Sequence, residues 1–147
     1  MEFWKESVLV TAVISWFVAQ LIKVILTLIV NKRLDFRRLV GSGGMPSSHS
    51  SFVTGLAASV GIIEGFSSTN FAICTVFALV VMYDAAGVRR AAGQQAKILN
   101  KLIAQWEKSD YSETDKHLKE LLGHTPKEVF AGAALGVFIA VLRHIWL

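Results

Sequence analysis

Residues 43–50, with the sequence GGMPSSHS, lie between two apolar runs and just after a basic cluster. The glycines allow a tight turn and a close approach of the backbone to a ligand. Pro46 sets the φ angle for the start of a helix, and Ser47 and Ser48 are favourable N-caps. A helix N-terminus presents amide donors to an anion, and His49 titrates near neutral pH. The stretch therefore predicts either a phosphate site or an ordinary serine-capped helix start.

The composition around this stretch indicates one membrane-embedded domain over residues 1–147. Hydrophobic residues make up 53% of the chain and the mean hydropathy is +0.50, which is too apolar for an ordinary soluble domain. The first six residues lack the basic lead of a cleavable signal peptide. Cys74 is the single cysteine and lies in an apolar run, so no internal disulfide is expected.

The apolar residues fall in four blocks, about Val8–Val30, Phe52–Ile63, Phe71–Met82 and Val129–Leu147. The first is long enough to span a bilayer, whereas the second and third need flanking polar residues to span, or are re-entrant. Residues 84–108 have apolar and basic positions on opposite faces of a helix, which is typical of a helix at the headgroup level. We expect an all-α integral membrane protein with about four membrane helices plus a cytoplasm-facing amphipathic helix.

Basic residues are concentrated between the first two blocks and between the last two, and are absent between the second and third. The positive-inside rule then places both basic segments in the cytoplasm and both termini outside. This topology brings His49 and His124 to the cytoplasmic face of what we expect to be a bacterial plasma membrane.

A lysine inside the first block is a further candidate. Gln20 and Lys23 share one helical face, and a lysine within a span marks a functional site by default. The alternative is that Lys23 snorkels to the interface. In the last block, Gly132 and Gly136 form a small-residue pair that suits helix packing and would permit a homodimer.

The last block is preceded by a capping box. Thr125, Pro126 and Glu128 have the N-cap, N1 and N3 residue types, and His124 comes directly before them. Two histidines at helix starts suit phosphomonoester hydrolysis, because one can attack phosphorus and the other can protonate the leaving oxygen. Glu128 has two interpretations, as a helix cap alone or as the carboxylate that orients a catalytic imidazole.

With these motifs, the sequence resembles the type 2 phosphatidic acid phosphatase superfamily, which includes vanadium haloperoxidases, and most closely its divergent small membrane branch. Residues 46–49 resemble the Pro-Ser-Gly-His motif, with Ser48 for glycine, and His124-x-x-x-Glu128 resembles a His-x-x-x-Asp motif. The resemblance implies that His124 is the nucleophile, Glu128 its partner and His49 the general acid. It also implies chemistry that needs no metal or cofactor.

The chain departs from the superfamily in its cationic motifs. Lys32 and Arg38 are separated by five residues with no proline following, and Leu118 stands where the third motif has Ser-Arg. The phosphate must therefore be bound by other groups, and the candidates are Ser47, Ser48, Lys23, Arg89, Arg90 and Arg38. Asp84 is expected to cap the amphipathic helix, with pairing to Arg89 or Arg90 as the alternative.

These features predict a lipid-phosphate phosphatase acting on phosphatidylglycerol phosphate, phosphatidic acid or a polyprenyl diphosphate. The degraded cationic motifs leave an alternative, a non-catalytic protein that binds or transports anionic lipids in a relic phosphate pocket. Nucleic-acid binding is not expected, because membrane topology and headgroup contact account for the few basic residues.

Overall fold

The computed structural model describes residues 7–31, 44–107 and 123–146, and the regular structure in these ranges is entirely α-helical. The helices are α2 (Val8–Asn31), α3 (Ser48–Glu64), α4 (Thr69–Ala86), α5 (Val88–Glu107) and α6 (Pro126–Trp146). The helices α3 and α4 extend past their apolar blocks into flanking polar residues.

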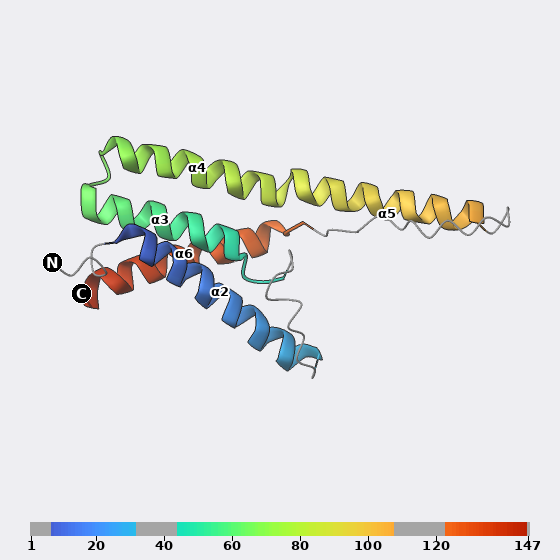
Figure 1. Ribbon diagram of the computed structural model, residues 1–147, viewed down its shortest axis with the longest axis horizontal. Coiled ribbons are helices and arrows are strands. Elements are labelled where there is room, and N and C mark those ends of the chain that lie inside the picture. The colour runs from blue at the N-terminus through green and yellow to red at the C-terminus, as the bar shows by residue number, and fades with distance from the viewer. Residues whose placement is uncertain (1–6, 32–43, 108–122, 147) are drawn as a thin grey trace.

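The helices α2 and α4 run in one direction along the bundle, and α3 and α6 run in the other (Figure 1). The starts of α3 and α6 therefore meet the end of α4 at one end of the bundle. The start of α2 and the end of α6 lie together at the opposite end. This arrangement confirms that His49 and His124 share one face of the protein.

Three segments are long and apolar enough to cross a membrane: Val8–Ile29, Thr69–Gln105 and Pro126–Trp146. The remaining helix of the bundle, α3, has 17 residues and is about 25 Å long, somewhat less than the hydrocarbon core. It packs against α2, α4 and α6 more extensively than any other described helix packs against its neighbours, so it is the central helix of the bundle. The protein is an all-α integral membrane protein, with α3 enclosed by the longer helices.

The small side chains of α3 explain its central position. Its buried residues are all small or β-branched: Ser48, Ser50, Ser51, Val53, Gly55, Ala57, Ser59, Val60 and Gly61. On α6, a Cβ atom at Gly132 would collide with the backbone of Ser47, and one at Gly136 would collide with the carbonyl of Ser51. The two glycines thus pack α6 directly on α3 within one chain, as small residues do in membrane helices.

Amphipathic α5 begins at Val88, four residues later than the sequence predicts. Asp84 lies in the last turn of α4, so the expectation that it caps α5 is wrong. Gly87 separates the two helices, yet its amide donates to the carbonyl of Tyr83 at 2.8 Å, and its own carbonyl accepts from the amide of Ala91 at 2.9 Å. Because the hydrogen bonds continue, α5 extends almost in line with α4 and projects beyond the bundle (Figure 1). Its position at the headgroup level stays a prediction.

The packing of α3 on α6 predicts the effect of adding one methyl group. Gly132→Ala should destabilise the protein by about 1–3 kcal/mol, because the new Cβ must push the start of α3 away. The measurement is the apparent melting temperature in detergent. Ala134→Leu on the exposed face of α6 is the control and should leave that temperature nearly unchanged. Equal melting temperatures for Gly132→Ala and the wild type would contradict the packing described.

Candidate active site

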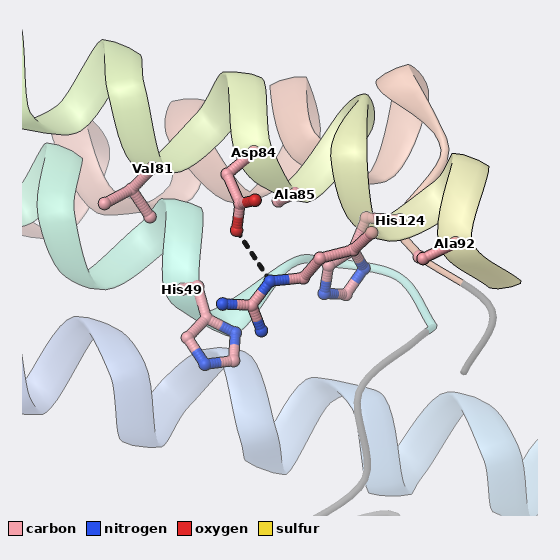
Figure 2. A pocket seen from close by; sticks show the side chains of 8 residues that line it. His49, Val81, Asp84, Ala85, Ala92 and His124 are labelled. Atoms are coloured by element: carbon pink, nitrogen blue, oxygen red, sulfur yellow. Dashed lines mark hydrogen bonds and ion pairs between the residues drawn. The ribbon is translucent and has the colours of Figure 1, made fainter. Parts of the chain in front are cut away.

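A cavity of about 130 Å³ lies where the starts of α3 and α6 meet the junction of α4 and α5 (Figure 2). It is lined by His49, Val81, Asp84, Ala85, Arg89, Ala92, Gly123 and His124. The lining therefore combines two histidines, one ion pair and a wall of small apolar side chains. Within the described ranges, no group of three or more histidine, cysteine, aspartate or glutamate side chains could hold a metal ion.

His124 is held in one orientation. Its side chain is buried, and its backbone amide donates to the carbonyl of Ala85 at 3.1 Å. Its Nδ1 lies 3.0 Å from Oε2 of Glu128. Its Nε2 is buried and has no hydrogen-bond partner among the described residues. Because an ionised carboxylate only accepts hydrogen bonds, Nδ1 carries a proton, and the lone pair of a neutral ring is left on Nε2.

Glu128 also closes the capping box predicted from the sequence. The amide of Thr125 donates to Oε2 of Glu128 at 3.2 Å, and the amide of Glu128 donates to Oγ1 of Thr125 at 3.4 Å. The same carboxylate oxygen thus caps α6 and contacts the imidazole of His124. The two interpretations of Glu128 are therefore geometrically compatible, since one oxygen makes both contacts.

His49 lies in the first turn of α3, with its ring centroid 6.5 Å from that of His124 and the ring planes inclined at 59°. The start of α3 is tied to α6 by a hydrogen bond from the amide of Ser47 to the carbonyl of Glu128, at 3.0 Å. This bond and the nearby contact at Gly132 fix the distance between the two histidine-bearing segments.

The serines of residues 43–50 form the helix start. Ser47 is the N-cap, and its Oγ accepts hydrogen bonds from the amide and the hydroxyl of Ser50 at 3.3 and 3.0 Å. Ser48 is the first residue of α3 and is buried. Pro46 precedes the cap and has a cis peptide bond to Met45. The expectation that a serine of this stretch caps the helix is confirmed for Ser47. Ser47 and Ser48 lie outside the cavity lining.

Two of the predicted cations lie near the histidines. Arg89 lines the cavity, and its Nε is 2.7 Å from Oδ2 of Asp84 (dashed line in Figure 2). Lys23 is only 2% exposed, because its face of α2 packs inside the bundle, so it does not snorkel to an interface. The positive charges of both Arg89 and Lys23 act on the imidazole of His49.

Of the predicted cations among the described residues, Arg89 alone lines the cavity, since Lys23 lies outside the lining. Arg90 is exposed on α5 and lies outside the cavity lining, although its backbone packs against Gly123. Arg38 lies outside the described residues.

Asp84 lines the cavity although its sequence pattern predicted a helix start. The alternative prediction, that Asp84 pairs with Arg89 or Arg90, is confirmed for Arg89. The spacing of Asp84 and Arg89 across Gly87 is the sequence signal for this pair.

The orientation of His124 predicts its tautomer. In ¹⁵N NMR of the detergent-solubilised protein with labelled histidine, one of the four histidines should have a protonated Nδ1 and an unprotonated Nε2. Glu128→Ala should change this signal, because the carboxylate partner of Nδ1 is lost. Thr125→Ala removes the other half of the capping box and should leave the signal in place. A His124 signal unaffected by Glu128→Ala would contradict the described contact.

Comparison with known proteins identifies the family of this chain. The family described as "Divergent PAP2 family" matches residues 4–139, a range that contains both histidines of the cavity. The uncharacterized membrane protein YuiD of Bacillus subtilis (strain 168) is 40% identical over 152 aligned residues, which cover 97% of this chain and 96% of that protein. No solved structure matches the chain significantly. The helical membrane fold, the paired histidine motifs and these matches together show that the chain belongs to the Divergent PAP2 family.

Proposed function

We propose that this protein is a membrane lipid-phosphate phosphatase in which Nε2 of His124 attacks phosphorus. One observation carries the proposal: the His124 ring is held through Nδ1 by Glu128, while Nε2 is buried without a hydrogen-bond partner among the described residues. A nucleophile oriented by a carboxylate through its other nitrogen is the arrangement that activates imidazole. Membership of a family related to phosphatases supports the same chemistry.

The reaction has two steps. First, the lone pair of His124 Nε2 forms an N–P bond as the bond between phosphorus and the lipid alcohol breaks, and His49 donates a proton to the departing oxygen. Then water attacks the phosphohistidine, His49 takes up a proton from that water, and the N–P bond breaks. Inorganic phosphate leaves and both histidines return to their starting states. Glu128 stabilises the positive ring of the intermediate through Nδ1.

The phosphoryl oxygens carry the developing charge, and cations must stabilise it. Arg89 lines the cavity, and Lys23 lies near enough for its charge to act on His49. We assign the phosphate to these two cations, together with amide donors at the start of α3 next to Ser47 and Ser48. Arg90 is assigned no contact with the phosphate, because it neither lines the cavity, as Arg89 does, nor lies buried in the bundle, as Lys23 does. No step of this mechanism requires a metal ion.

The surroundings of the cavity indicate the class of substrate. Val81, Ala85 and Ala92 give it an apolar wall, and the exposed face of neighbouring α4 is apolar, which suits a phosphate attached to a lipid. The distribution of basic residues favours a cytoplasmic site and hence a lipid of the inner leaflet. Phosphatidylglycerol phosphate fits this placement best among the three candidate lipids.

The direct test is phosphate release by the purified protein in detergent, with a chelator present, from each of the three candidate lipids. His124→Ala and His49→Ala should each reduce turnover to about one hundredth or less, because each removes a group that acts in bond making or proton transfer. His144→Ala, at the other end of α6, is the matched control and should keep full activity.

Activity that survives His124→Ala would disprove the mechanism. Binding of lipid headgroups by the wild type without phosphate release from any of these lipids would instead support the alternative, a non-catalytic protein that binds anionic lipids.

The two contacts of Glu128 can be separated by mutation. Thr125→Ala removes the N-cap and should cost about 1 kcal/mol of stability while turnover is retained. Glu128→Gln preserves a capping box, so stability should change little, but it removes the negative charge beside His124. Turnover should then fall by about 10²–10⁴-fold. Equal turnover in Glu128→Gln and the wild type would leave Glu128 as a helix cap only.

A further inference from the structure

The ion pair between Asp84 and Arg89 is the one feature of the cavity that the proposed mechanism leaves unexplained. A carboxylate beside a phosphate site repels the ligand, so its presence there needs a reason. The side chains are 58% exposed for Arg89 and 39% exposed for Asp84. Ion pairs as exposed as this one add little to protein stability. Stabilisation of the fold is therefore a poor explanation for a carboxylate in this place.

The geometry of the pair gives a better explanation. Asp84 lies in the last turn of α4 and Arg89 in the first turn of α5, on either side of Gly87. Because backbone hydrogen bonds continue through Gly87, the two turns hold the Cα atoms of Asp84 and Arg89 in a fixed relative position. Asp84 accepts from Nε of Arg89, which leaves the two terminal nitrogens of the guanidinium for other partners. A guanidinium can contact two oxygens of a phosphate at once when it is correctly oriented.

We propose that Asp84 is a positioning residue that holds the guanidinium of Arg89 toward the cavity shared with His49 and His124, so that its terminal nitrogens receive the phosphate. This inference rests on the proposed function, because it assigns the cavity to a phosphate group. Asp84 itself does not touch the substrate. It acts by limiting the rotamers of a long side chain that would otherwise be free at a half-exposed site.

The negative charge of Asp84 and its proposed role in orienting Arg89 predict opposite changes in anion affinity for one substitution. Asp84→Asn removes a negative charge from the cavity, so electrostatics alone would make an anion bind more tightly. If Asp84 positions Arg89, the same substitution weakens anion binding, because the guanidinium loses its orientation. The sign of the change therefore separates the two effects.

The experiment measures binding of inorganic vanadate to the full chain in detergent by calorimetry. Asp84→Asn and Arg89→Gln should each weaken binding by about tenfold, and the double variant should bind no more weakly than Arg89→Gln alone. Asp84→Glu, which keeps the carboxylate, should restore part of the affinity. Lys97→Gln removes a positive charge from the exposed face of α5, away from the cavity, and should bind vanadate as the wild type does.

Tighter or unchanged binding by Asp84→Asn would overturn the inference, and so would losses that add independently in the double variant. A wild type that binds no vanadate would also overturn it, since there would be no anion site for Arg89 to serve. The proposed function fails separately, when the wild type releases no phosphate from lipids. In that case the vanadate series still decides whether Asp84 positions Arg89.

Discussion

The backbone contact between the start of α3 and the first turns of α6 determines the rest of the site. The amide of Ser47 donates to the carbonyl of Glu128, and Gly132 lets the backbone of Ser47 lie directly against α6. Side chains between two helices leave room for adjustment, whereas a contact between backbones leaves very little. The separation of His49 and His124 follows from this contact, because each histidine is within a few residues of it.

The capping of α6 and the orientation of His124 depend on the same side chain, Glu128. One carboxylate oxygen of Glu128 accepts from the amide of Thr125 and contacts the ring of His124. The carboxylate that closes the first turn of α6 therefore also orients the imidazole of His124. The ring contact is local to the start of α6, while the backbone of His124 is tied to α4 through the carbonyl of Ala85.

Local signals in the sequence predicted much of this structure. Apolar length predicted α2, the capping box predicted the start of α6, and the distribution of charge predicted that His49 and His124 share one face. The features that depend on tertiary contacts were not predictable. The burial of Lys23 depends on which face of α2 meets the bundle. The place of Asp84 depends on the hydrogen bond from the amide of Gly87 to the carbonyl of Tyr83, which keeps α4 and α5 in line. The choice of Ser47 rather than Ser48 as the N-cap of α3 likewise follows from the contacts of its hydroxyl with Ser50.

The proposed mechanism requires Nε2 of His124 to become covalently bonded to phosphorus during turnover. It is tested most directly by mixing the protein with lipid phosphate, stopping the reaction in alkali, in which phosphohistidine survives, and locating the modified residue by mass spectrometry. We expect a phosphoryl group on His124 of the wild type. Phosphate release by the wild type with a phosphoryl group on a residue other than His124 would contradict it.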